Sequence, residues 1–236
     1  DMFFAELQDT FRKLRGRGLL WEGLNEPVVH TIEEAKMVNR WYVRFAEIMH
    51  ANGELAAAFS WSTGNPVNIN LVAPYVADAA AACDVHAYHE YYNTMHGGND
   101  CARYRQFEAA LPAHARKPVI ITGAGLDNNG EQYTGGYRGR LTYQQYLDVL
   151  KQYDALLMQD PYVLGATIFA WGDWSWPSFE LQPMIDLFAY HILSVGQGAV
   201  TPRPWPIPQF GPPPSTYFFA ATPDRILQGQ SSTLKW

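Results

Sequence analysis

The chain has 236 residues, of which 47% are hydrophobic and 17% charged, so it can bury one large core or a core with a small appendage. Its net charge of −6, with acidic and basic residues interspersed, excludes the basic surface that nucleic acid or an anionic membrane would attract. No apolar run approaches the roughly 20 residues of a transmembrane helix, so membrane insertion is not expected.

The first part of the chain predicts a helix and then a buried strand. The helical stripe consists of Phe3, Leu7, Phe11 and Leu14. The strand lies within residues 18–24 and stops at Asn25-Glu26-Pro27, because proline cannot pair in a sheet ladder. The sequence therefore places a carboxylate, Glu26, at the exit of the first strand.

Helices and strands alternate through the next part of the chain. Thr31 and Glu34 form a capping box that begins a helix ending at Asn52-Gly53, and Thr142 and Gln145 form a second box. The remaining patterns predict strands at 55–61, 83–89, 117–122 and 164–170, and helices at 71–82, 104–111, 142–157 and 184–193. Each strand is followed by a polar or aromatic segment.

Strands spaced by about 30 to 45 residues with helices between them indicate a parallel α/β sheet. A doubly wound sheet would carry a Gly-rich phosphate loop, and the glycines between Gly123 and Gly130 do not match that fingerprint. A (β/α)8 TIM barrel keeps its functional residues at the carboxyl ends of the strands, as this chain does. We predict such a barrel in part, its strands four to eight, and expect three strands to precede residue 1.

The composition changes near residue 200. Seven prolines lie between Pro202 and Pro214, which predicts a stiff linker over 200–216. Residues 217–236 alternate like the first strands of a β-sandwich and resemble the start of an immunoglobulin-like repeat. We therefore expect a catalytic-type domain over 1–199, the linker, and a truncated β domain.

Four segments resemble one known family, over about residues 1–195. Trp21 to Pro27, His86-Ala87-Tyr88, the strand from Lys117 to Thr122, and Phe169-Ala170-Trp171 look like strands four, six, seven and eight of the retaining (β/α)8-barrel β-glycoside hydrolases. The resemblance implies that Glu26 is the general acid/base, that Asn25 bonds the sugar 2-hydroxyl, that Tyr88 orients the nucleophile and that Trp171 floors a sugar subsite. It also implies an exported or cell-surface protein that uses neither metal nor cofactor.

The aromatic content of 14%, with 8 tryptophans, suits stacking against sugar faces. We expect a sugar to contact Trp61, Trp171, Trp174 or Trp176 through its C–H faces, and His86, Asn25 or Asp173 through its hydroxyls. Glu22 is expected to be a salt-bridged scaffold residue. The predicted partner is therefore a poly- or oligosaccharide.

One departure concerns the nucleophile. The family pattern on strand seven is Ile-Thr-Glu, whereas this chain has Ile121-Thr122-Gly123. Because retaining hydrolysis needs two carboxyl groups about 5 Å apart, little or no hydrolysis is expected. Three explanations stay open: a non-catalytic sugar-binding module, a substitute acid at Asp127 or Glu131, or a deliberate substitution at Gly123.

Two further possibilities come from the remaining residue types. Asp84, His86 and His89 form the one candidate cluster for a metal-dependent hydrolase of another class. Cys83 and Cys101 could form one disulfide in an exported protein.

Overall fold

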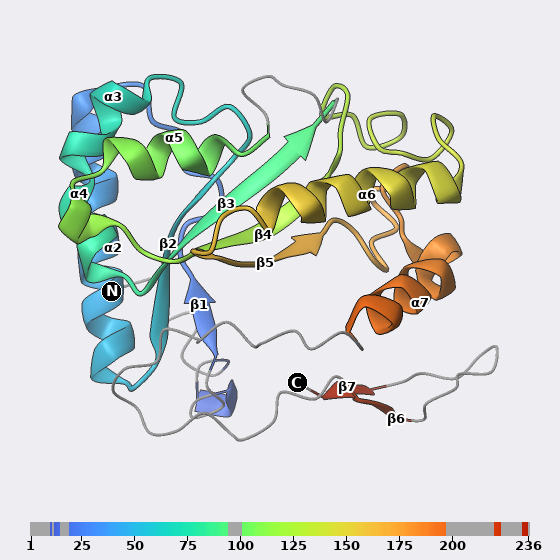
Figure 1. Ribbon diagram of the computed structural model, residues 1–236. Coiled ribbons are helices and arrows are strands. Elements are labelled where there is room, and N and C mark those ends of the chain that lie inside the picture. The colour runs from blue at the N-terminus through green and yellow to red at the C-terminus, as the bar shows by residue number, and fades with distance from the viewer. Residues whose placement is uncertain are drawn as a thin grey trace. The chain divides into compact units, whose positions relative to one another are not determined.

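The computed structural model describes residues 10, 12–14, 19–93, 101–196, 220–222 and 233–235 (Figure 1). Most of the predicted opening helix and the whole linker over 200–216 lie outside these residues. The chain divides into two compact units, Asp1–Arg203 and Pro204–Trp236, and each is described by itself.

The first unit contains one sheet of five strands: β1 (Leu20–Glu22), β2 (Leu55–Trp61), β3 (Val85–Tyr92), β4 (Val119–Leu126) and β5 (Val163–Ile168). All neighbours are parallel and follow the chain in the order β1-β2-β3-β4-β5. A doubly wound sheet would reverse its strand order at a switch point, and this sheet does not. The strands form a half-barrel, which confirms the prediction of a partial TIM-barrel fold.

The helices of this unit follow the strands along the chain. They are α2 (Ile32–Ala51), α3 (Ile69–Val72), α4 (Ala77–Ala82), α5 (Arg103–Ala110), α6 (Tyr143–Leu157) and α7 (Ile185–Gly196), with short 3-10 turns at Ala73–Tyr75, Ala113–Ala115 and Gln182–Met184. Both predicted capping boxes form, at Thr31 and Thr142. The single helix predicted over 71–82 is wrong, since the chain there is divided between α3, a 3-10 turn containing Pro74, and α4.

The core between helices and sheet is rich in aromatic rings. Tyr42 of α2, Phe59 and Trp61 of β2, and Phe107 of α5 are all buried. The rings of Phe59 and Trp61 stack with centroids 5.1 Å apart, and Phe107 packs against both of them. Each such ring removes about 150–250 Å² from water on folding, so this cluster is a major source of stability.

Strands β3 and β4 run further than the sequence predicts. β3 continues to Tyr92 and β4 to Leu126, so Glu90–Tyr92 and Gly123–Leu126 belong to strands rather than to loops. The β3–β4 register shifts between Tyr88 and His89, and the β4–β5 register shifts between Ile121 and Ala124. Such irregularities alter which way successive side chains point.

In the second unit, β6 (Ala220–Thr222) and β7 (Thr233–Lys235) form an antiparallel pair. The other residues of the predicted sandwich start lie outside the described part. Cys83 is a buried thiol rather than half of a disulfide, so it is not bridged to Cys101. Within the described residues, no helix combines the length and apolarity needed to cross a membrane.

Candidate active site

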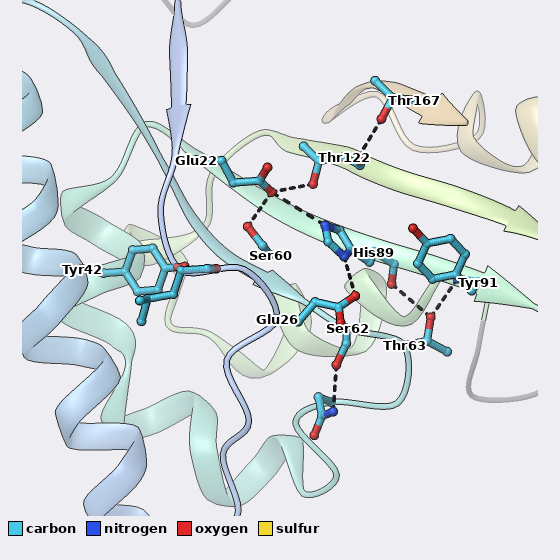
Figure 2. Close-up of polar contacts among 12 residues, drawn as sticks. Glu22, Glu26, Tyr42, Ser60, Ser62, Thr63, His89, Tyr91, Thr122 and Thr167 are labelled. Carbon is cyan, nitrogen blue, oxygen red and sulfur yellow. Dashed lines mark hydrogen bonds and ion pairs between the residues drawn. The ribbon is translucent and has the colours of Figure 1, made fainter. Parts of the chain in front are cut away.

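The side chains of β3 alternate between the two faces of the sheet. His86 and Tyr88 contact Glu108 of α5, on the face that the helices cover. His89 points the other way and contacts Glu26. We call the face opposite α5 and α6 the inner face; it carries Glu22, Ser60, His89, Tyr91 and Thr122 (Figure 2).

The structure places His86 and Trp61, predicted to contact a sugar, and Tyr88, predicted to orient the nucleophile, in the core. His86 is fully buried, with Nδ1 2.6 Å from Glu108 Oε1 and Nε2 3.1 Å from Ala80 O. Tyr88 donates its hydroxyl to the same Glu108 oxygen, and burial together with Glu108 raises the pKa of Tyr88. Trp61 is only 1% exposed. These three side chains belong to the core because their strand positions face the helices.

Glu26 and His89 are joined at the exit of the first strand. Oε1 of Glu26 lies 2.6 Å from Nδ1 of His89, and the side chains are 38% and 11% exposed, respectively. Glu26 has a φ of 49°, in the left-handed region that non-glycine residues rarely occupy. Strained backbone of this kind concentrates at functional sites, and here it aims the carboxylate at β3 (Figure 2).

Helix α2 fixes the segment that carries Glu26. The Tyr42 hydroxyl donates to the Leu24 carbonyl at 3.0 Å. A Cβ at Gly23 would lie 2.5 Å from Tyr42 Cε1 and 2.8 Å from a ring carbon of Trp41, so only glycine fits there. The aromatic face of α2 therefore sets the path of the chain between Glu22 and Glu26.

Gly123 lies on the same side of the sheet as Glu26. A Cβ at Gly123 would be 2.7 Å from the Tyr91 hydroxyl oxygen and 3.5 Å from Cδ2 of His89. Because the register is irregular at this point of β4, both Thr122 and Gly123 are directed at the inner face. The space beside Gly123 is thus next to the ring that contacts Glu26, and the Tyr91 hydroxyl fills it.

The hydroxyl of Tyr91 holds its proton more tightly than that of an ordinary tyrosine. Burial raises its pKa well above the ordinary tyrosine value, and the charges of Glu26, Asp127 and Glu22 raise it further. Its backbone N–H donates to Thr63 Oγ1 at 2.8 Å, and that hydroxyl contacts the His89 carbonyl. The segment after β2 therefore holds both inner-face residues of β3.

Glu22 is the second carboxylate of the inner face. Its Oε1 accepts hydrogen bonds from Ser60 Oγ and, at 2.6 Å, from Thr122 Oγ1 (Figure 2). The same oxygen lies 3.9 Å from Nε2 of His89, and the Glu22 side chain is 35% exposed. The sequence predicts a scaffold role for Glu22, and its patterns single out neither Tyr91 nor His89 as a partner of Glu26. The repeated His-x-Tyr pattern, at residues 86–88 and again at 89–91, was the signal for them.

Asp127 and Glu131, the two substitute acids proposed from the sequence, form hydrogen bonds within the loop that carries them. Asp127 Oδ1 accepts from the backbone N–H groups of Asn129 and Gly130, at 3.1 and 2.8 Å. Glu131 Oε2 accepts from Tyr133 N and Thr134 Oγ1. Both carboxylates therefore stabilise the turn that follows β4.

The predicted aromatic platform follows β5. Trp171 is 52% exposed, and its Nε1 donates to Gln182 Oε1. Trp174 is 83% exposed. Asp173 accepts from Ser175 and shapes the turn between the two rings. Asn25 is exposed beside Glu26.

The residues of the proposed metal cluster have separate partners. Asp84 binds His50 at 2.8 Å, His86 binds Glu108, and His89 binds Glu26. Among the described residues, no group of three or more His, Cys, Asp or Glu side chains could hold a metal ion. The metal-dependent alternative therefore has no site in the described part of the chain.

Neither a protein-family model nor a curated protein matches this sequence. Several solved glycoside hydrolases resemble its structure. An endo-β-1,3-glucanase of family GH128, subgroup II, from Sorangium cellulosum is 14% identical, with a TM-score of 0.50 over 75% of this chain and 68% of that one. A subgroup I enzyme from Amycolatopsis mediterranei, crystallised as a variant with laminarihexaose, is 17% identical, with a TM-score of 0.47 over 69% of this chain.

A β-glucuronidase from Faecalibacterium prausnitzii is 16% identical, with a TM-score of 0.45 over 69% of this chain. This chain spans 66% of the length of the Amycolatopsis enzyme and 27% of the glucuronidase. At these identities the likeness concerns the fold. The likeness to the Sorangium enzyme, with its TM-score of 0.50, supports a partial TIM-barrel fold.

Proposed function

We propose that this chain is a glycoside-hydrolase-like module that acts on or binds a poly- or oligosaccharide, with Glu26 as the general acid/base. The observation that carries the proposal is the contact between Glu26 and His89 directly beside Gly123. An acid at the carboxyl edge of a parallel half-barrel, next to the position where the resemblance places the nucleophile, is the arrangement that retaining hydrolysis uses.

The proposal gives each neighbouring group a role. Asn25 bonds the 2-hydroxyl of the sugar, Trp171 provides the stacking surface, and Asp173 contacts outer hydroxyls. Tyr91, rather than Tyr88, offers a hydroxyl beside Gly123. Because Gly123 has no carboxylate, a covalent glycosyl intermediate cannot form there, and retaining hydrolysis is impaired.

A non-catalytic carbohydrate-binding module is the second candidate. Gly123 and the exposed rings of Trp171 and Trp174 favour it, since stacking needs no nucleophile. In both cases we propose an exported or cell-surface protein in which residues 1–199 form the sugar-directed domain, 200–216 the linker and 217–236 the start of a β-sandwich.

Calorimetry of the full chain against laminari-, cello-, xylo- and manno-oligosaccharides tests the sugar site. We expect at least one series to bind, and Trp171→Ala to weaken that binding about 2- to 10-fold. Tyr190→Ala is the matched control, because Tyr190 is 75% exposed on α7. Absence of binding across all four series, or equal losses in both variants, contradicts the proposal.

Hydrolysis assays then separate the two candidates. If the chain is an enzyme, Glu26→Gln lowers turnover of the bound oligosaccharide by about 10²–10⁴-fold. Gly123→Glu raises turnover of an aryl glycoside once Tyr91→Phe has removed the hydroxyl that occupies the new side chain's path. Binding without turnover in every one of these proteins assigns the chain to the binding class.

A further inference from the structure

We propose that Glu22 supplies the second carboxylate of this site, as the general base that activates water for hydrolysis with inversion. The inference rests on the proposed function, in which Glu26 is the acid. It assigns to this chain a chemistry that needs no side chain at Gly123.

The contacts of Glu22 hold a carboxylate ready for a reaction. Two hydroxyl donors, Ser60 and Thr122, converge on Oε1 and fix its position. Neither donor is a cation, so the carboxylate is oriented without being neutralised. Its side chain is 35% exposed, which leaves it open to water. Thr122 directly precedes Gly123, so Glu22 reaches the strand on which the nucleophile is missing.

The two other acids considered from the sequence, Asp127 and Glu131, are less suited. The charge of Asp127 raises the pKa of Tyr91 more than that of Glu22 does. However, Asp127 Oδ1 already accepts hydrogen bonds from two backbone N–H groups of its own turn. Glu131 is bound in the same way within that turn. A base must keep its geometry to within about 0.5 Å, and Glu22 is the acid anchored on the sheet itself.

His89 connects the two carboxylates. Glu26 and Glu22 contact opposite ring nitrogens, Nδ1 at 2.6 Å and Nε2 at 3.9 Å, so the imidazole lies between them (Figure 2). Retention needs a carboxylate that bonds to the anomeric carbon, whereas inversion needs one that activates water. Because Gly123 offers no nucleophile, a second carboxylate at Glu22 would act on water, and the reaction would proceed with inversion.

In the reaction, Glu22 takes a proton from water while the water oxygen bonds to the anomeric carbon from the face opposite the leaving group. The bond from that carbon to the glycosidic oxygen breaks, and Glu26 gives its proton to the departing oxygen. The products are a sugar of inverted configuration and an alcohol. Glu22 has gained one proton and Glu26 has lost one, and exchange with solvent restores both.

The test follows hydrolysis of the best-binding oligosaccharide by proton NMR, using the full chain. We expect the first anomer released by the wild-type protein to have the configuration opposite to that of the cleaved bond. Glu22→Gln should lower kcat by about 10²–10⁴-fold with little change in KM. Asp127→Asn is the matched control and should change kcat less than about 5-fold.

Three outcomes overturn the assignment: release of the retained anomer, an undiminished kcat in Glu22→Gln, or a larger loss in Asp127→Asn than in Glu22→Gln. The anomer is measured on the wild-type chain, so it decides even if Glu22→Gln does not fold. Oligosaccharide binding without any hydrolysis also overturns the role of Glu22, yet it leaves the proposed sugar site standing. Absence of binding removes the proposed function itself.

Discussion

Strand β3 carries the pattern His-x-Tyr twice, at residues 86–88 and 89–91, and the two copies face opposite sides of the sheet. His86 and Tyr88 share a buried oxygen of Glu108, under α5. His89 and Tyr91 lie on the inner face, where they adjoin Glu26 and Gly123. An offset of three residues exchanges the faces of a strand, because side chains alternate with a period of two. Residue type therefore does not separate a core pair from a site pair, whereas strand parity does.

The largest expected effect separates the two histidines. His86→Ala removes the imidazole partner of Glu108, which is only 6% exposed, and should cost about 3–5 kcal/mol of unfolding free energy. His89→Ala should cost only about 1 kcal/mol, because Glu26 is partly exposed and can regain water. Urea unfolding of both variants measures the difference. Equal losses would mean that the two faces are equally buried.

A smaller effect is expected at Gly123, where the inner face is tight against Tyr91. Gly123→Ala places a methyl group 2.7 Å from the Tyr91 hydroxyl and should cost about 1 kcal/mol, since the ring end can shift. The cost should shrink in a Tyr91→Phe background. Gly165→Ala on β5 is the control, because nothing lies within 4 Å of its added Cβ. A double-mutant cycle by thermal unfolding checks the coupling, and additive losses would argue against the contact.

The smallest effect concerns pH and Glu90, which faces the helices between Tyr88 and Tyr92 of β3. Burial raises the pKa of Glu90, although hydrogen bonds from Tyr153 and backbone N–H groups oppose the rise. The folded state therefore holds this proton more tightly than the unfolded chain. The stabilisation is complete below the unfolded pKa and is lost as pH rises through the folded pKa. Unfolding free energies should show this loss in the wild type and not in Glu90→Gln.

Much of the fold could be predicted because it depends on local patterns. Two helix starts follow from the capping boxes at Thr31 and Thr142, and strand β2 follows from its apolar run. The regular alternation of helices and strands predicts the parallel order. The break at Pro74 was predictable from proline chemistry and was missed.

The site was harder to predict, for a physical reason. β3 is buried on nearly its whole length, so hydrophobicity does not mark which residues face inward, and His86 was chosen over His89. The roles of Tyr91 and Glu22 depend on contacts between residues from 32 to 100 positions apart in the chain, which local periodicity does not contain. Glu26 and Gly123 could be singled out because each ends a strand pattern.

The short path from Glu22 to Glu26, which Gly23 and the rings of α2 fix in place, has a mechanical consequence. Glu22 and Glu26 lie four residues apart on one continuous stretch of backbone. The distance between them therefore depends on the conformation of that segment alone. A change in the spacing between the strands of the half-barrel would therefore displace both acids together. Any sugar chemistry built on that pair would tolerate looseness elsewhere in the sheet that would separate acids held on different strands.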